Sequence, residues 1–449
     1  MFRRRIKNMQ MDRKTIPTWI PSYGILLLTI VLAVLIAFVP DKSPLFLTVL
    51  CLNLVFCVLN RKFFSSSVVA VVRSLVGLLF IFSGFTKGVD PLGTTYVIHD
   101  YLEAYNLPWL TGLSLFGSFF LNMLEFTIGV CLLFNVKFKW TVIVTALMML
   151  FFTATTWYDA VANPVPDCGC FGKAVVMTNW QTFYKNLVLD ACVLVLLFSM
   201  NRIPDRRPAV FNAVIAGAAA LLFLGFEYYN YRYLPVVNFL EWKEGTRLFP
   251  ENPQPVQHFV TYRNKLNGET KEYLLEECPY ADPIWVENWE FVDRRDVDPN
   301  PQTVNINIVD KVDDEDPGWD VTKDLLETDS YLFLVAVYDL EESDREGMAK
   351  VAEAVKRLRE AGYECCFLTS STVKEAEECK KTYGLEDFMF YYSDNTAIKA
   401  VIRSNPGIVL LRDAWVLKLW DWRRFPAPED IDLAALSQGV GFEGAGEQQ

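Results

Sequence analysis

Histidine is almost absent from this chain of 449 residues, with His99 and His258 as the only two. They lie in different parts of the sequence, and no pair of cysteines is matched by a second pair at the spacing of a tetrahedral metal site. Walker-type glycine loops, Gly-x-Ser-x-Gly motifs and dinucleotide-binding glycine fingerprints are absent as well. We therefore expect no metal site, and no motif favours nucleotide binding or serine-hydrolase chemistry.

Basic residues are outnumbered in the second half of the chain. Residues 1–240 hold 19 Lys and Arg against 11 Asp and Glu, whereas residues 241–449 hold 23 against 43. A surface this acidic argues against binding to nucleic acid or anionic lipid through the second half, so we expect no nucleic-acid partner. The first half is expected to be a membrane domain and the second a soluble domain of ordinary size.

Long apolar runs dominate the first half. Seven of them approach the roughly 17–25 residues that cross a bilayer, which predicts a membrane bundle of about seven spans surrounded by lipid. No cleavage-site pattern follows the first run, so we expect an anchor and not a removed signal peptide. The seven runs are about 19–39, 44–60, 68–86, 112–134, 139–160, 182–200 and 209–228.

The basic residues of the first half alternate from loop to loop. They cluster in the N-terminal tail and in three loops, at Arg61/Lys62, Lys137/Lys139 and Arg202/Arg206/Arg207. The positive-inside rule then places the N-terminus in the cytoplasm, and residues 87–111, 161–181 and everything after about 229 outside. In a bacterium this is the cytoplasmic (inner) membrane, with a periplasmic C-terminal domain.

A Cys-x-Cys pair lies in one of the predicted outer loops, as Asp167-Cys168-Gly169-Cys170-Phe171-Gly172. Disulfides persist in an oxidising compartment, and one that spans a single residue closes a small strained ring, which raises its reduction potential. Cys168 and Cys170 could therefore exchange electrons with a thiol substrate or be reoxidised by a quinone. A structural clip in the loop is the alternative.

Charged residues within the predicted spans are a second candidate site. Arg73, Glu125 and Asp190 each cost a few kcal/mol unless paired or hydrated. A buried Arg73–Glu125 or Arg73–Asp190 pair would line a pocket for a quinone headgroup or a proton path, or would only hold helices together. Lys87 and Lys185 at the outer interface could polarise a quinone carbonyl, although extension toward lipid headgroups is the simpler interpretation.

The acidic half contains two kinds of pattern. In residues 241–329, Asn267-Gly268 between two alternating runs predicts a β-hairpin, and the acidic segment Asp310–Asp320 resembles a solvated linker. Residues 330–437 alternate strand and helix, which predicts an α/β sheet covered by helices. The predicted order is strand 331–338, helix 344–361, strand 363–368, helix 371–383, strand 388–392, helix 396–403, strand 408–411 and strand 415–420.

This order resembles the thioredoxin-like fold, over about a quarter of the chain. Pro406 stands where that family keeps a cis-proline. The loop after the first strand, Asp339–Arg345, lacks the family's Cys-x-x-Cys pair. Cys365 and Cys366 are adjacent in the next strand and face opposite sides, so the resemblance implies a non-catalytic binding module. One or two structural disulfides among Cys278, Cys365, Cys366 and Cys379 are expected.

Residues 68–200 resemble the DoxX/MauE group of four-helix membrane proteins. The resemblance rests on Phe82–Gly88 followed by Asp90-Pro91, on Glu125 in a glycine-containing helix, on Cys168–Gly172, and on Tyr184-Lys185-Asn186. MauE-like proteins are linked to methylamine utilisation beside a thioredoxin-like partner, which implies disulfide or maturation chemistry outside the membrane. DoxX-like proteins are linked to thiosulfate or quinone chemistry and to oxidative stress.

Two functional hypotheses remain open, and with them whether this protein is an enzyme. In the first it is a membrane thiol-redox or maturation factor, with Cys168 and Cys170 as the exchanging pair, a quinone as cofactor and an extracytoplasmic protein client or thiol partner. In the second it is a scaffold that presents an extracytoplasmic binding domain. The predicted organisation is an N-terminal tail with two spans (1–67), the DoxX/MauE-like unit (68–200), a last span (201–240), a β-rich segment with an acidic linker (241–329) and the thioredoxin-like domain (330–449).

Overall fold

The structure is a computed structural model that describes residues 66–165, 169–201, 203, 207–250, 254–297, 304 and 306–438. The chain divides into two compact units, and the boundary along the sequence lies between Phe239 and Leu240. The first two predicted spans and Cys168 lie outside the described residues.

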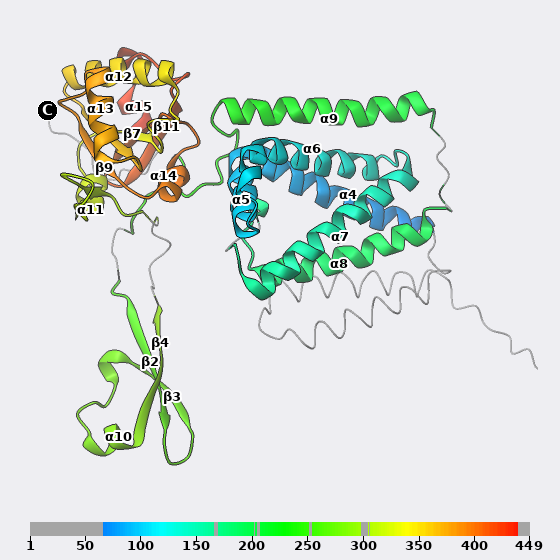
Figure 1. The fold of residues 1–449 in the computed structure, drawn as a ribbon, viewed down its shortest axis with the longest axis horizontal. Helices are drawn as coiled ribbons and strands as arrows, with labels where there is room; N and C mark the ends of the chain where they lie inside the picture. The colour runs from blue at the N-terminus through cyan, green and yellow to red at the C-terminus, as the bar shows by residue number, and fades with distance from the viewer. Residues whose placement is uncertain are drawn as a thin grey trace, which may run out of the picture. The chain divides into compact units, whose positions relative to one another are not determined.

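The first unit is a bundle of long helices with a short helix across one end (Figure 1). Five helical segments in the described part of the chain are long and apolar enough to cross a membrane, which confirms the last five predicted spans. The elements are α4 (Ser66–Val89), α5 (Pro91–Ala104), η2 (Pro108–Leu113), α6 (Ser114–Leu133), α7 (Phe138–Ala162), β1 (Cys170–Lys173), α8 (Asn179–Ser199) and α9 (Ala209–Arg232).

Local sequence signals begin and end these helices. Asp90 caps α5 by accepting from the Gly93 amide at 3.0 Å, and Pro91 follows at the first helical position, where its missing N–H costs nothing. Thr178 and Gln181 form a capping box at the start of α8. Asn163 ends α7 in the left-handed conformation. The chain therefore turns sharply at the end of the bundle that carries α5 and β1.

Glycines allow α4 and α6 to pack closely. A Cβ atom on Gly129 would lie 2.6 Å from the carbonyl oxygen of Gly77 and 2.6 Å from the amide nitrogen of Ile81, and one on Gly84 would lie 2.8 Å from the amide nitrogen of Phe126. Small residues at such crossings let helix backbones approach and gain van der Waals contact in a membrane. This contact sets the distance between the side chains that α4 and α6 carry.

The second unit contains a mixed seven-stranded sheet in the order β11-β10-β7-β8-β9-β5-β6. Strand β7 is buried along its whole length, and the described structure confirms the predicted alternation of strands and helices. The Asn405–Pro406 peptide is cis. The elements are β5 (Val309–Asp310), β6 (Trp319–Asp320), α11 (Thr322–Leu326), β7 (Leu332–Val337), α12 (Arg345–Glu360), β8 (Glu364–Thr369), α13 (Val373–Tyr383), β9 (Met389–Tyr392), α14 (Asn395–Val401), β10 (Gly407–Arg412), β11 (Trp415–Asp421), η4 (Pro428–Asp430) and α15 (Leu433–Gln438).

Most of the segment Asp310–Asp320 is exposed, as expected of a solvated segment, but the segment is not a linker. Its two ends pair with each other as β5 and β6, and Val309 pairs with Tyr392 of β9. A strand of two residues is too short to show the alternation of apolar and polar side chains that predicts a strand. The acidic turn between them extends the edge of the sheet.

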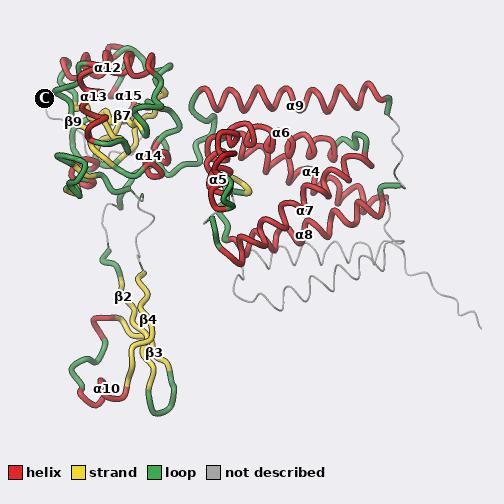
Figure 2. Tube along the Cα trace, in the orientation of Figure 1, coloured by secondary structure: helices red, strands yellow, loops and turns green. Residues whose placement is uncertain are grey.

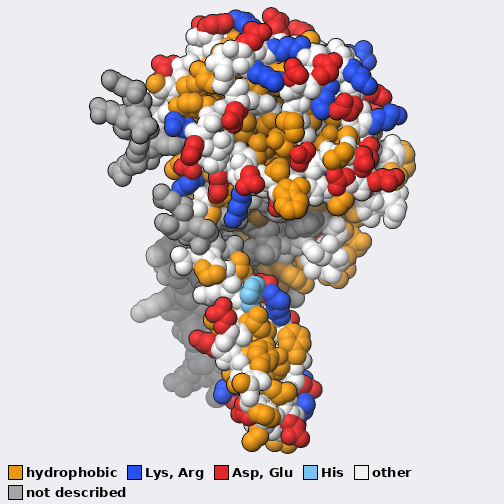
Figure 3. Space-filling view, turned by 90° about the vertical axis from the view of Figure 1, so that its left-hand side faces the viewer, with side chains coloured by type: hydrophobic (Ala, Val, Ile, Leu, Met, Phe, Trp, Pro, Cys, Tyr) orange, Lys and Arg blue, Asp and Glu red, His pale blue; other side chains and the backbone are white. Residues whose placement is uncertain are grey.

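The predicted hairpin is present as β2 (Gln257–Asn264) and β3 (Thr270–Leu274), and β4 (Trp289–Val297) completes a separate sheet in the order β3-β2-β4 (Figure 2). Helices η3 (Leu275–Glu277) and α10 (Pro283–Asn288) connect β3 to β4. Trp285 and Trp289 stack with ring centroids 5.9 Å apart. Figure 3 shows hydrophobic side chains gathered on one face of this small sheet.

We predict that Gly129→Ala destabilises the membrane unit by about 1–3 kcal/mol, because the added methyl group meets the backbone of α4 and the helices must separate. Thermal unfolding of the purified protein in detergent measures the change. Gly217→Ala on α9 is the matched control, since its Cβ would meet nothing within 4 Å. Equal unfolding temperatures for the two variants would contradict the close α4–α6 contact.

Candidate functional site

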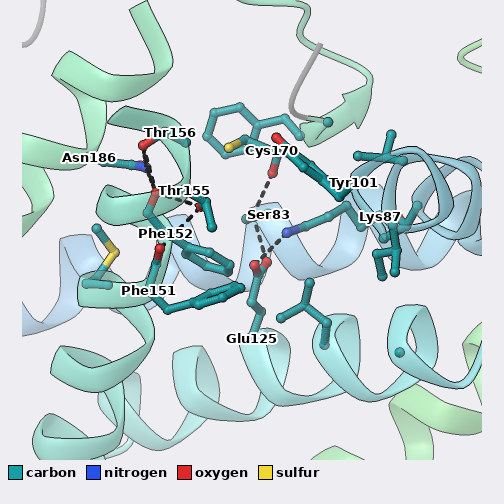
Figure 4. A pocket seen from close by; sticks show the side chains of 18 of the residues that line it. Ser83, Lys87, Tyr101, Glu125, Phe151, Phe152, Thr155, Thr156, Cys170 and Asn186 are labelled. Atoms are coloured by element: carbon teal, nitrogen blue, oxygen red, sulfur yellow. Dashed lines mark hydrogen bonds and ion pairs between the residues drawn. The ribbon is translucent and has the colours of Figure 1, made fainter. Parts of the chain in front are cut away.

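A cavity of about 470 Å³ lies inside the membrane unit, at the end of the bundle that carries α5 and β1 (Figure 4). Its volume falls in the range of small-molecule sites. The walls come from α4, α5, α6, α7, α8 and β1, and most of the lining is apolar.

Helix α5 covers one side of this cavity. The spacing of Val97, Ile98, Tyr101, Leu102 and Tyr105 places them on one face of the helix, and all five line the cavity. The opposite face carries the exposed carboxylates of Asp100 and Glu103. Helix α5 is therefore an amphipathic cover with 14 residues, too short to span a bilayer.

A buried ion pair forms the polar wall of the cavity. Lys87 Nζ on α4 lies 2.5 Å from Glu125 Oε1 on α6, and the two residues are only 5% and 1% exposed. Ser83 Oγ lies 2.8 Å from Glu125 Oε2 and 2.8 Å from the carbonyl oxygen of Cys170. A serine hydroxyl has one hydrogen, so Ser83 donates to only one of these two acceptors at a time and lies between Glu125 and the strand that carries Cys170.

Further polar groups face the cavity from the other side. Asn186 donates to Thr156 Oγ1 at 3.1 Å, and the Tyr101 hydroxyl donates to Asp159 Oδ2 at 2.6 Å. Lys185 Nζ sits 4.5 Å from the centre of the Phe171 ring, which is a cation–π contact. These contacts tie α5 to α7 and β1 to α8.

Four of the predicted site residues, Lys87, Glu125, Cys170 and Lys185, line the cavity, whereas Arg73 and Asp190 do not. Cys168 lies outside the described residues. The predicted pairing of Arg73 with Glu125 or Asp190 is wrong.

Both residues have other partners. Arg73 donates to the carbonyl oxygens of Leu132 and Leu133, the latter at 2.9 Å, where the C-terminal end of α6 leaves carbonyls unpaired. Asp190 Oδ2 accepts from Thr153 at 2.8 Å. Lys87 does not extend toward lipid headgroups, because it is buried against Glu125.

Sequence reasoning missed Ser83, Tyr101 and Asp159 as parts of the site. Ser83 and Lys87 are four residues apart on one helix, so this spacing was the available signal for a shared face. Tyr101 and Asp159 come from α5 and α7, and only the packing of α5 across the bundle brings them together.

The four described cysteines of the second unit are free thiols, so the expected structural disulfides are wrong. Burial raises the pKa of Cys365 to about 12 and that of Cys379 to about 11, and it also raises the pKa of Cys366. Thiols of this kind are poor nucleophiles at neutral pH because the thiolate is the reactive form.

These features define a multi-pass membrane protein with a cavity inside its helix bundle. Residues 65–199 match the family model described as methylamine utilisation protein MauE. The match runs from the start of α4 to the end of α8, so the chain contains a MauE-like membrane region over slightly less than a third of its length. The comparison with curated proteins finds no match, and neither does the comparison with solved structures.

We predict that Lys87→Met alone destabilises the membrane unit by about 3–5 kcal/mol, because Glu125 is left buried without its cation. The double variant Lys87→Met/Glu125→Leu should recover most of this loss, since no uncompensated charge remains. Thermal unfolding in detergent measures both, and Lys185→Met is the control for losing a lysine at the same cavity. A double variant less stable than Lys87→Met would contradict the pairing.

Cys365, Cys366 and Cys379 are predicted to resist alkylation by iodoacetamide in the folded protein at pH 8. With a pKa of about 11 or 12, about one thiol in a thousand or fewer is ionised at that pH. Labelling should rise with pH and become complete in denaturant, where the thiol pKa returns to about 8.5. Mass spectrometry of the labelled peptides checks this, and labelling of the folded protein at the rate of a free peptide cysteine would contradict it.

Proposed function

We propose that this protein is a membrane thiol-redox or maturation factor, with Cys168 and Cys170 as the exchanging pair and a quinone as electron acceptor. The observation that carries the proposal is the position of Cys170. It lines the cavity on a short strand whose carbonyl group is 2.8 Å from Ser83, next to the buried Lys87–Glu125 pair. The MauE-like match over the same helices supports it.

The oxidation of the two thiols balances the reduction of one quinone. Forming the Cys168–Cys170 disulfide removes two electrons and two protons, and reduction of a quinone to a quinol takes up two of each. Lys87 would polarise the acceptor's carbonyl oxygen, and Glu125 would hold a proton in transit. Arg73 and Asp190, also considered for this role, do not line the cavity and would act on it through helix packing.

The location of the site supports an extracytoplasmic reaction. Helix α5 and strand β1 lie at the same end of the bundle (Figure 1), as they must if residues 87–111 and 161–181 share one side of the membrane. The alternating basic loops favour the outer face of a bacterial cytoplasmic membrane for that side. There the exchanging pair would meet an oxidising compartment.

For the second unit we propose a thioredoxin-like binding domain that holds a protein client. Its strand order β11-β10-β7-β8, with β7 and β8 parallel and β10 antiparallel to β7, supports that fold. The loop after β7 contains Asp339 and Asp344 but no cysteine, and of the β8 thiols Cys366 is buried and Cys365 is half-buried. These observations also favour the second candidate function, a scaffold in which this domain alone carries the activity.

The test is differential alkylation of Cys168 and Cys170 in intact membranes, with acid quenching before and after addition of reductant or quinone. We expect the pair to be reduced by added thiol and reoxidised by quinone. In a Cys168→Ser variant, Cys170 should accumulate a mixed disulfide with a client protein. Cys131→Ser in the buried part of α6 is the control and should behave as the wild type.

If the oxidation state of Cys168 and Cys170 never changes when thiol or quinone is added, the redox proposal is wrong and the scaffold function remains. A Cys168→Ser/Cys170→Ser variant that complements a deletion strain fully would lead to the same conclusion. Removal of residues 240–449 would then be the change that abolishes complementation.

A further inference from the structure

The side of the cavity that faces the bilayer shows how a ligand would reach it. Phe120 on α6 and Phe151 on α7 are the exposed members of its lining, at 50% and 59%, whereas the other lining side chains are buried or half-buried. Both belong to candidate membrane spans. In the described part of the unit, exposed side chains on a membrane span face lipid, which points to a lateral opening between α6 and α7.

The opposite approach, from water, is covered. Helix α5 lies across the end of the bundle with its apolar face on the cavity and its carboxylates outward. The hydrogen bond between Tyr101 and Asp159 attaches α5 to α7, and that between Ser83 and the Cys170 carbonyl attaches β1 to α4. A solute in the aqueous phase would have to break these contacts, whereas a molecule dissolved in the bilayer would not.

The interior of the cavity favours a ligand with a planar, uncharged headgroup. The ring of Phe152 lies 5.6 Å from Lys87 Nζ, so aromatic faces and hydrogen-bonding groups occur side by side. Because Glu125 already neutralises Lys87, this wall presents an ion pair and not a free cation. A phosphate head would gain little from this ion pair and would have only Lys185, already in contact with the Phe171 ring, as a second cation in the lining. A bare acyl chain would leave the polar groups of the wall unused.

We propose that the cavity is loaded laterally from the membrane, by an amphiphile with a planar neutral head beside Lys87 and Glu125 and an apolar tail that leaves between Phe120 and Phe151. This inference rests on the proposed function for the identity of the head as a quinone. It adds the route of entry and the requirement for a tail.

Gly117 provides the means to block the cavity. It lines the cavity on α6, and a Cβ atom there would meet only the end of Ile98 at 3.6 Å, an ordinary contact. A leucine at this position has room for its first carbon and must place the rest in the cavity. Gly112→Leu is the matched control, because it adds the same side chain in η2 where nothing lies within 4 Å.

The experiment uses the full chain in phosphatidylcholine nanodiscs and a decylubiquinone that carries a diazirine at the end of its tail. We expect photolabelling of the α6 and α7 peptides that contain Phe120 and Phe151. Labelling should fall about tenfold in Gly117→Leu and stay unchanged in Gly112→Leu, since only the former removes ligand volume. Unlabelled decylubiquinone should compete with the label. The parent benzoquinone without a tail should need a concentration at least about tenfold higher for the same competition.

A second variant, Thr155→Phe, fills the same cavity from α7 and guards against misfolding of Gly117→Leu; it should lose labelling too. Labelling that is unaffected by both variants, that maps outside α6 and α7, or that the tail-less quinone blocks equally well would overturn lateral loading. So would a co-purified phospholipid that decylubiquinone does not displace.

The same labelling in the Cys168→Ser/Cys170→Ser background separates this inference from the proposed function. Binding needs no thiol, so labelling should persist there. If the cavity is labelled but the oxidation state of the cysteine pair never changes, the redox proposal is wrong and lateral loading stands. If the cysteine pair is oxidised and reduced but the cavity is not labelled, lateral loading is wrong and the redox proposal stands.

Discussion

The close approach of α4 and α6 is the constraint on which the membrane unit depends. Three glycines, Gly77, Gly84 and Gly129, bring the two backbones so near that a single methyl group would collide with the opposite helix. That distance lets the α4 side chains of Ser83 and Lys87 reach Glu125 on α6. In a bilayer the hydrophobic effect does not drive helices together, so packing at small residues and interhelical polar contacts must do so.

The buried ion pair gives this packing a chemical consequence. Two charges this deep are costly unless each satisfies the other, and the Ser83 hydroxyl adds a third partner that also reaches the backbone of Cys170. Ser83 therefore connects the ion pair to the strand that carries the thiol. The rest of the cavity is apolar, and its low dielectric constant screens these electrostatic contacts less than water would.

Pattern-based reasoning worked best where burial alone decides the structure. The apolar runs of α4, α6, α7, α8 and α9 and the alternating elements from β7 to β11 were all predicted, because each follows from its own residues. It failed for Arg73, whose partners turned out to be backbone carbonyls at the end of α6. It failed again for β5 and β6, whose two-residue strands exist only because β9 offers an edge.

The sequence by itself determined the division into an apolar half and an acidic half, the spans, and the loop in which two cysteines lie one residue apart. Tertiary structure alone decided which charges meet. Glu125 had the cations Arg73 and Lys87 as possible partners, and hydrophobic periodicity does not distinguish between them. The choice of Lys87 follows from the rotation and spacing of α4 against α6, which glycine contacts set through the backbone.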